Sequence, residues 1–188
     1  MRGLTSCFQF IFNNQNDVNL PPNTCVYHDP PPVVDHTHNP TVFGKILSGQ
    51  LPSRDHLETT ELLAFHDRWP KAKLHALVIP KCWYKSVYSL TPVDDVNLIQ
   101  DMTQMGHDIL KEQQPQALAN EDYILCFHIP PFYSVAHLHL HVLAPASEMN
   151  FLNRYIKFQC GTRWCISCSD VLERLKSGQM AVPYKQFF

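Results

Sequence analysis

The sequence predicts an α+β domain, in which an antiparallel sheet of about five strands packs against one long helix, with short helices at its edges. Three observations indicate this fold class. Segment 91–115 carries apolar residues at helical spacing. Several short apolar segments between residues 56 and 167 have the length of strands. The first 40 residues differ in composition from the rest, and the chain has no internal repeat.

Length, charge and cysteine content limit the class of protein. A chain of 188 residues can form one domain with a sizeable core. The net charge of −2 argues against a generally basic surface, so nucleic acid is not expected as a partner. Seven cysteines without regular spacing, and no evident secretory signal, indicate that most of them are free thiols in a reducing compartment. We therefore expect an intracellular protein of the cytoplasm, the nucleus or both. The apolar start "LTSCFQFIFNN" is too short to span a bilayer, and no membrane is expected.

Composition divides the chain into three parts. Residues 1–40 are rich in Asn and Pro, which predicts an extended arm because proline fixes φ and lacks a backbone donor. The domain is expected to cover 41–176, and residues 177–188 are expected to form a C-terminal tail. The arm contains four potential zinc ligands, but their spacing matches no familiar site and a polar tail is favoured. These ligands are Cys25, His28, His36 and His38.

The domain begins with a short helix and three strands. "VFGKILSGQ" predicts a helix that ends near Gly49. "HLETTELLAFHD" predicts a hairpin or two short strands around residues 56–66. "LHALVIP", residues 74–80, predicts a buried strand that Pro80 ends.

The long helix is the clearest element. Thr91 is the expected N-cap, Pro92 suits the first turn, and two aspartates then favour the positive helix end. Pro115 follows its end. One stripe of residues is expected to face the core: Val96, Ile99, Met102, Gly106 and Ile109.

The last third of the domain contains strands and a closing helix. "DYILCFHI" and "AHLHLHVLAP" predict two strands joined through "PPFYSV", and "TRWCIS" is a further candidate strand. "SDVLERLKSG" predicts a short helix with Ser169 as its cap and Gly178 at its end.

Three histidines alternate along the strand "AHLHLHVLAP". Because successive side chains of a strand point to opposite faces, His137, His139 and His141 are expected to share one face, opposite the apolar residues between them. Imidazoles act as nucleophiles, as acids and bases near neutral pH, and as metal ligands. The alternative is a half-buried strand with a solvated polar face, which three histidines with no other polar residue among them disfavour.

"HLHLHVL" resembles the signature of the histidine triad superfamily, in which three histidines alternate with apolar residues. "VFGKILSGQLP" is similar to the opening helix of that family, and "LLAFHDRWPKAKLHALVIPK" to its next two strands. The resemblance covers roughly residues 41–176. Within the superfamily, "FHIPPFYSVAHLHLHVLAP" most resembles the third subtype of the histidine triad nucleotide-binding proteins, and the aprataxin branch is next.

The resemblance implies a hydrolase that binds a purine nucleotide and cleaves AMP conjugates at the α-phosphorus. The usual substrates are adenosine 5′-phosphoramidates, esters or anhydrides, and the first step forms a histidine–AMP adduct. His139 is the expected nucleophile, with His137 and His141 donating to phosphate oxygens. By resemblance, His75 supports the triad and Ser134 contacts the phosphate or the leaving group.

The nucleotide pocket is also implied by the resemblance. Asp67 is expected to accept from the ribose hydroxyls, although a turn residue before Pro70 is an alternative. His128 is expected near the phosphate, or else as a core histidine. Four apolar residues match positions that hold the base, although an apolar helix stripe is more often core. These residues are Val42, Phe43, Ile46 and Leu51.

The sequence departs from the family at two kinds of position. Many relatives carry a zinc site in which cysteines stand where this chain has Thr41 and Gly44, and a histidine where it has Trp83. We therefore expect no zinc there, and no metal or cofactor is assigned. Cys126 replaces a pocket asparagine, which leaves the leaving-group preference open. A second metal site is conceivable in "CGTRWCISC", but without a fourth ligand nearby buried thiols are favoured. The cysteines concerned are Cys160, Cys165 and Cys168.

Three other functions compete with the phosphoramidase. The first is an aprataxin-like hydrolase that removes AMP from adenylated nucleic-acid ends, an idea that the basic and aromatic "KFQCGTRW" keeps open. The second is a metalloprotein that uses the three histidines as ligands, which His75, Ser134 and Asp67 argue against. The third is a nucleotide-binding scaffold with little turnover. A homodimer is left open.

Overall fold

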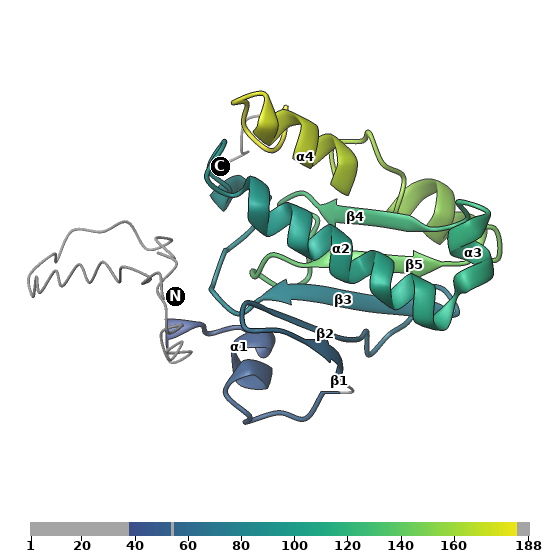
Figure 1. The fold of residues 1–188 in the computed structure, drawn as a ribbon, viewed down its shortest axis with the longest axis horizontal. Helices are drawn as coiled ribbons and strands as arrows, with labels where there is room; N and C mark the ends of the chain where they lie inside the picture. Colours follow the sequence, from purple (N-terminus) through teal and green to yellow (C-terminus); the bar gives the residue numbers. More distant parts are fainter. Residues whose placement is uncertain (1–37, 54, 184–188) are drawn as a thin grey trace, which may run out of the picture.

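The computed structural model describes residues 38–53 and 55–183, so the predicted arm lies almost wholly outside the described residues. Its elements follow the order shown in Figure 1. The helices are α1 (Val42–Leu47), α2 (Val96–Gln113), α3 (Pro115–Ala119) and α4 (Cys168–Lys176), with a 3₁₀ turn η2 (Val87–Ser89) and a π-helical turn η3 (Asn153–Lys157). The strands are β1 (Asp55–Glu58), β2 (Leu62–His66), β3 (Leu74–Pro80), β4 (Ile124–His128), β5 (Leu140–Ala144) and β6 (Cys165–Ser167).

The strands form one antiparallel sheet of six, in the order β1-β2-β3-β5-β4-β6. The α+β prediction is confirmed, and the candidate strand in "TRWCIS" becomes the edge strand β6. In every central strand, alternate side chains pack into the core on the side of the sheet that α2 and α4 cover. We call this side of the sheet the α2 face. Figure 1 shows both helices on this side of the sheet.

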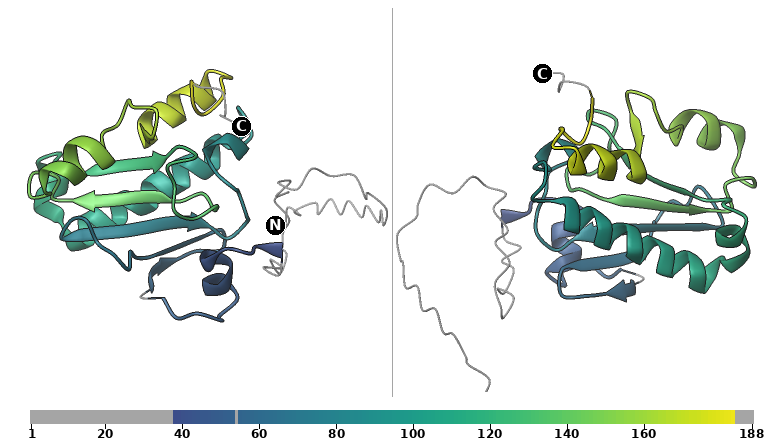
Figure 2. Two further views of the ribbon diagram at one scale, coloured as in Figure 1. Left: turned by 180° about the vertical axis from the view of Figure 1, so that it is seen from behind. Right: turned by 45° about the horizontal axis from the view of Figure 1, so that its top comes forward.

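The opposite side of the sheet, which we call the histidine face, carries two smaller apolar clusters. At one end, Phe43 of α1 packs with residues of β2 and β3. The view from behind in Figure 2 shows α1 near this end of the sheet. At the other end, Cys126, Phe158 and Cys165 pack with Leu143 of β5. The histidines of β3, β4 and β5 lie between these clusters, so both apolar groups wall the same site.

Two predicted helix starts are wrong, for local reasons. Helix α2 begins at Val96 rather than after Thr91, because the Asp95 carboxylate accepts from the Thr91 backbone N–H at 2.6 Å and from the Tyr84 hydroxyl at 2.8 Å. These bonds close a turn ahead of the helix. Helix α4 is capped by Ser167 rather than Ser169, since the Ser167 hydroxyl accepts from the Asp170 N–H at 3.0 Å.

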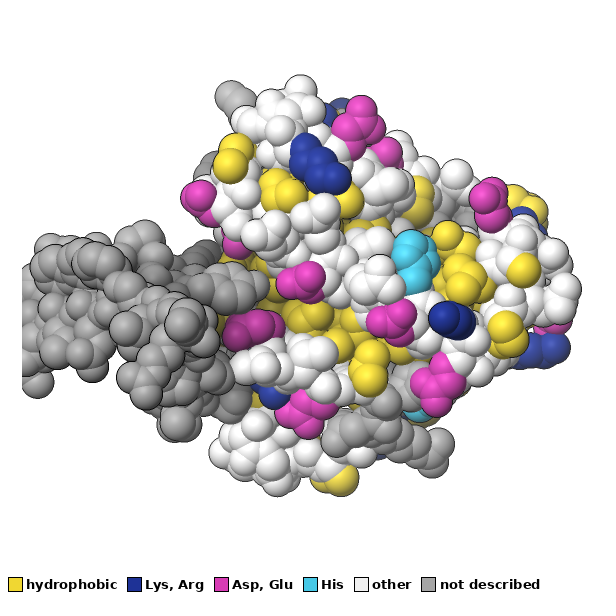
Figure 3. Space-filling view, viewed as in Figure 1, with side chains coloured by type: hydrophobic (Ala, Val, Ile, Leu, Met, Phe, Trp, Pro, Cys, Tyr) yellow, Lys and Arg dark blue, Asp and Glu magenta, His cyan; other side chains and the backbone are white. Residues whose placement is uncertain are grey.

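The predicted core stripe of α2 is confirmed, with Ile99, Met102 and Ile109 buried against the sheet. Past the closing helix, Ala181 and Val182 are buried in the same core, so the packed part of the chain extends beyond residue 176. Among the described residues, no helix is long and apolar enough to cross a bilayer. On the described surface of the α2 side, acidic and basic side chains are scattered rather than gathered into one patch (Figure 3).

Candidate active site

The three alternating histidines lie on the histidine face, but only one belongs to the paired strand. Strand β5 begins at Leu140, so His137 and His139 precede the strand, with His137 in a bend. The prediction of one continuous strand is therefore wrong, although the alternation holds because Leu138, Leu140 and Val142 enter the core of the α2 face. All three imidazoles are buried, and the rings of His139 and His141 meet at 4.9 Å between centroids.

The protonation of His139 is determined by one hydrogen bond. Its Nδ1 lies 2.6 Å from the backbone carbonyl oxygen of His137, and a carbonyl oxygen can only accept. Nδ1 therefore carries the proton and Nε2 keeps a lone pair. Burial lowers the pKa of His139, because the charged form loses its hydration. A neutral imidazole with a free Nε2 lone pair at neutral pH has the form that a nucleophile needs.

A second chain of hydrogen bonds fixes His75 and His141. The Lys71 backbone N–H donates to Nδ1 of His75 at 3.2 Å, so the proton of His75 resides on Nε2. Nε2 of His75 then donates to Nδ1 of His141 at 3.0 Å, which leaves the proton of His141 on its own Nε2. That Nε2–H is buried and has no partner. A buried donor without an acceptor is costly, so this atom is a strong candidate to bind a phosphate oxygen.

Burial keeps these histidines neutral. It lowers the pKa of His75 to about 4, against an opposing effect of the nearby Asp67 charge. It also lowers the pKa of His141 well below the ordinary value, and the neighbouring histidines act in the same direction. The hydrogen-bond chain can therefore hold its neutral protonation at physiological pH.

His137 is engaged at both ring nitrogens. Its Nε2 donates to the Pro80 carbonyl oxygen at 2.8 Å, and its Nδ1 lies 2.8 Å from the Asn39 side-chain nitrogen. The orientation of that amide is fixed, because Oδ1 of Asn39 accepts from the N–H of Thr41 at 3.2 Å and from its hydroxyl at 2.8 Å. A phosphate contact from His137, as predicted, would require one of these bonds to open. In this structure, His137 instead supplies the carbonyl that orients His139.

Asn39 was missed by the sequence analysis, which placed it in the extended arm. It is only 6% exposed, and it lies at the start of the described chain just before the Thr41 cap of α1. Gly44 makes room for it, since a Cβ at Gly44 would lie 2.2 Å from the Asn39 carbonyl oxygen. Thr41 and Gly44, two of the positions that replace family zinc ligands, therefore help to place an amide against His137.

Asp67 lies at the edge of the histidine cluster. One carboxylate oxygen is 3.7 Å from Nε2 of His75, and the other accepts from the Trp69 N–H at 2.6 Å. Its side chain is partly exposed. The turn interpretation is therefore correct as a local description, and the carboxylate also faces the site. Its contact with a ribose stays a prediction.

The predicted base pocket divides into two groups. Phe43 is buried, and its ring meets those of His137 and His139 edge-on at 5.7 and 5.4 Å between centroids. Ile46 is partly buried against the apolar cluster that Phe43 forms with residues of β2 and β3. Val42 and Leu51 are 43% and 39% exposed, respectively, so they are accessible to a ligand rather than part of the core.

His128 and Phe158 complete the floor of the site. The His128 ring lies 4.7 Å from that of His141 and stacks on Phe158 at 5.1 Å. Its Nε2 lies 3.1 Å from the Lys157 carbonyl oxygen and so donates to it, and burial lowers its pKa to about 4. Phe158 also contacts His75 and His141, and no sequence signal singled it out. His128 is thus beside the triad, with one nitrogen held by the backbone.

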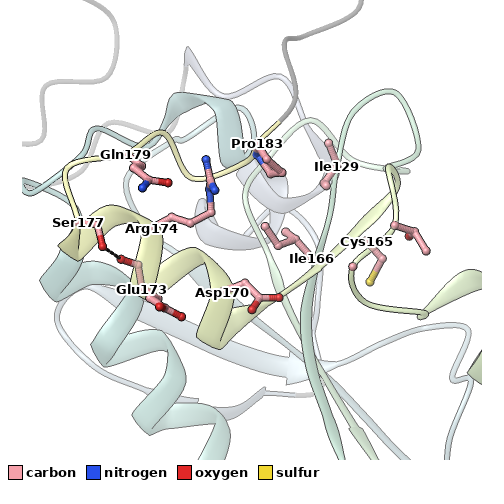
Figure 4. Close-up of a pocket in the computed structure, with 11 residues that line it drawn as sticks. Ile129, Cys165, Ile166, Asp170, Glu173, Arg174, Ser177, Gln179 and Pro183 are labelled. Carbon is pink, nitrogen blue, oxygen red and sulfur yellow. Dashed lines mark hydrogen bonds between the residues drawn. The ribbon is translucent and has the colours of Figure 1, made fainter.

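Two hollows differ in their relation to the histidines. A narrow one of about 10 Å³ is lined by His128, His137 and His139 together with Lys85, Ser86 and Tyr133. Ser134 is exposed on the loop beside it. A larger hollow of about 340 Å³ lies between α4 and the chain around Gly161, lined by Asp170, Glu173 and Arg174 among others (Figure 4). It contains no triad histidine, so the chemistry above is not located there.

A metal ion is the alternative use of these side chains. Asp67, His75 and His141 each have a ligand atom within 4.8 Å of the others. A metal shared by both imidazoles would have to displace the proton between Nε2 of His75 and Nδ1 of His141. The Lys71 N–H already occupies the other nitrogen of His75. The hydrogen bonds therefore account for this cluster without a metal.

Comparison with known proteins gives consistent results. The family model "Scavenger mRNA decapping enzyme C-term binding" matches residues 40–157. The chain is 36% identical over 137 residues to the adenosine 5′-monophosphoramidase HINT3 of Xenopus tropicalis, covering 72% of this chain and 87% of that protein. It is 34% identical over 161 residues to HINT3 of Danio rerio, covering 84% and 96%.

Solved structures with this fold include a HIT family hydrolase from Clostridium thermocellum, with a TM-score of 0.51, 27% identity, and coverage of 57% of this chain and 91% of that chain. A HIT family hydrolase from Legionella pneumophila has a TM-score of 0.50, 28% identity, and coverage of 55% and 90%. Strands β1 to β5 and the histidines of the site lie within residues 40–157, the part of the chain that the family model matches.

Proposed function

Because this chain belongs to the histidine triad superfamily, we propose that it is a hydrolase that cleaves adenosine 5′-phosphoramidates and related AMP conjugates at the α-phosphorus. The observation that carries the proposal is the pair of nitrogens that face the site. Nε2 of His139 has a lone pair, and Nε2 of His141 has a proton without a partner. A nucleophile beside a buried donor fits attack on a phosphorus that bears charged oxygens.

The proposed reaction has two steps. In the first, the Nε2 lone pair of His139 forms a bond to the α-phosphorus, and the bond from phosphorus to the leaving nitrogen breaks. The electron pair goes to that nitrogen, which takes up a proton and departs as an amine. In the second step, water attacks the adduct, the bond between phosphorus and Nε2 breaks with its electron pair returning to Nε2, a proton of the water passes to solvent, and AMP is released.

The surrounding groups each have a part in this scheme. Nε2–H of His141 binds a non-bridging oxygen and stabilises charge in the transition state. The His137 carbonyl holds Nδ1–H of His139, so that Nε2 remains the reactive atom in both steps. We assign the proton of the leaving amine to a relay through the hydroxyl of Ser134, which is exposed on the loop before the triad.

The preferred leaving group is the finer part of the proposal. One relative, 36% identical over 104 residues, is the Arabidopsis thaliana bifunctional adenosine 5′-phosphosulfate phosphorylase/adenylylsulfatase HINT4. The HINT3 relatives are 5′-monophosphoramidases and cover more of this chain. We therefore propose a nitrogen leaving group.

The test is to trap the covalent intermediate. The full chain is mixed with an adenosine 5′-phosphoramidate, quenched quickly and measured by intact mass, and the site is mapped by peptide sequencing. An increase equal to one AMP on His139, absent in His139→Asn, supports the mechanism. An adduct on another residue, or full turnover by His139→Asn, would contradict it. An oligonucleotide with a 5′-linked AMP serves as the competing substrate, and faster release from it would favour the aprataxin-like alternative.

A further inference from the structure

Three cysteines converge on the histidine face, outside the reacting histidines. Cys126 is in the middle of β4, Cys165 begins β6, and Cys160 is on the loop between η3 and β6. Their sulfur atoms all lie within 4.8 Å of one another, and those of Cys160 and Cys165 are 3.9 Å apart. All three are free thiols. From the sequence alone, Cys168 rather than Cys126 was the candidate partner of Cys160 and Cys165.

The fold, rather than chain proximity, forms this cluster. Strands β4 and β6 pair so that His128 faces Cys165 and Cys126 faces Ser167, which puts both cysteine side chains on the histidine face. A turn returns the loop to the sheet, because the Thr162 N–H donates to the Cys165 carbonyl oxygen at 3.2 Å. Cys160 is thereby held over the two strand cysteines. Cys168 is separate, since its sulfur bonds the Thr103 hydroxyl at 2.9 Å.

The sulfur spacing matches that of metal ligands. With a metal–sulfur bond of ~2.3 Å, a tetrahedral site separates its sulfurs by ~3.8 Å and a trigonal site by ~4.0 Å. The 3.9 Å between Cys160 and Cys165 agrees with both geometries. We propose that Cys126, Cys160 and Cys165 form a site for one thiophilic d¹⁰ cation, of the class of Zn²⁺, Cd²⁺ and Cu⁺. Thiolate is the ligand that these ions prefer.

The coordination is expected to be open on one side. Within the described residues, the group contains three ligand residues and no fourth. The nearby His128 is not among them, and its Nε2–H donates to the Lys157 carbonyl oxygen. Cys160 is partly exposed, whereas Cys126 and Cys165 are buried, so solvent can supply a fourth ligand on the side of Cys160. Zn²⁺ would take that ligand, whereas Cu⁺ is satisfied by three sulfurs.

Such an ion would stabilise the floor of the active site. Phe158 packs in the same cluster as Cys126 and Cys165, and its ring contacts His75, His128 and His141. Cys126 is also the register partner of His141 across β4 and β5. An ion bound to Cys160 ties the loop that follows Phe158 to both strands. The site is independent of the proposed reaction, because none of its ligands contacts the reacting atoms in the scheme above.

The experiment measures metal binding to the full, reduced, metal-free chain. Cd²⁺ is the probe, titrated while the ultraviolet thiolate-to-metal charge-transfer absorption is recorded. The background protein carries serine in place of Cys7, Cys25 and Cys82. Its remaining cysteines are the three of the cluster and Cys168. Cys160→Ser and Cys165→Ser test the site in this background, and Cys168→Ser is the matched control. Zn²⁺ and Cu⁺ are then compared by competition against the bound Cd²⁺.

The expected result is one Cd²⁺ per chain in the background protein and in Cys168→Ser. The affinity should fall at least tenfold in Cys160→Ser, which is partly exposed and least disruptive to the fold, and also in Cys165→Ser. Thermal melting without metal verifies that each variant is folded. Unchanged binding in Cys160→Ser, equal loss in Cys168→Ser, or no stoichiometric binding to the folded background protein would each overturn the proposal.

Discussion

Replacing Asn39 by alanine tests how the arm-side amide supports the site. The substitution removes the donor at 2.8 Å from Nδ1 of His137, which is buried. It also removes the acceptor for the N–H and hydroxyl of Thr41, but Thr41 is only partly buried and water can replace that contact. The main cost is the loss of this donor to a buried acceptor. We expect the free energy of unfolding to fall by about 1–3 kcal/mol.

Asn39→Asp is the matched control, because it keeps the shape and the acceptor for Thr41 but removes the donor. Nε2 of His137 still donates to the Pro80 carbonyl, so the new carboxylate can be satisfied only if Nδ1 is protonated as well. The folded variant is therefore expected to hold one more proton between these two side chains than wild type does. The stability that this proton restores is present at low pH and is lost as the pH rises.

The assay is urea unfolding followed by tryptophan fluorescence, at several pH values between about 5.5 and 8. The free energy of unfolding of Asn39→Asp should approach that of wild type as the pH falls. The free energy of unfolding of Asn39→Ala should not show this approach. Two results would refute the reasoning. One is an alanine variant within ~0.5 kcal/mol of wild type, the size of an ordinary surface substitution. The other is the same pH dependence in both variants.

Three further predictions concern the site. His139→Asn should lower turnover of an adenosine phosphoramidate by ~10⁴-fold or more while AMP affinity, measured by calorimetry, stays near wild type; near-normal turnover would remove His139 from its role. Asp67→Ala should weaken the preference for AMP over its 2′-deoxy analogue by about 1.5–3 kcal/mol, and an unchanged preference would leave Asp67 as a turn residue only. The buried His75 and His128, each with a pKa of about 4, should make stability fall as the pH drops. The loss should begin at ~6.5, where the unfolded chain takes up protons first, and end near 4, at roughly 1.4 kcal/mol per pH unit per group. His128→Phe should reduce that slope, and a slope equal to that of wild type would contradict the assignment.

Local patterns were enough to predict most of the sheet and the long helix. Apolar content and strand length identified β3, and alternation identified β5, because each strand has one face in the core beneath α2. The predicted start of α2 was wrong because it was inferred only from residues that are neighbours in the sequence. Thr91, Pro92 and the two aspartates form a normal helix start in sequence, but the hydroxyl of Tyr84 draws Asp95 into a turn. The periodicity of the sequence gives no indication of this contact between Tyr84 and Asp95.

The sequence predicted most residues of the site, but it predicted few of the contacts between them. The histidine pattern and the family resemblance named all four histidines of the hydrogen-bonded groups, together with Asp67. Asn39 and Phe158 could not be found in this way. Asn39 contacts a residue 98 positions away, and its segment is dominated by proline and asparagine without a period. Phe158 reaches the histidines from a loop, where apolar residues carry no periodic signal.

The three equally spaced histidines differ chemically, because the hydrogen-bond partner of each imidazole can act only as a donor or only as an acceptor. The Pro80 carbonyl and the Asn39 amide occupy both nitrogens of His137, which leaves it to orient its neighbour. The His137 carbonyl takes the Nδ1 proton of His139 and leaves a lone pair at Nε2. The Lys71 N–H, acting through His75, sets the opposite protonation in His141 and leaves a donor there. A backbone carbonyl and a backbone N–H thus separate nucleophile from donor, and a substitution that reverses either role should exchange a lone pair for a proton at the reacting face.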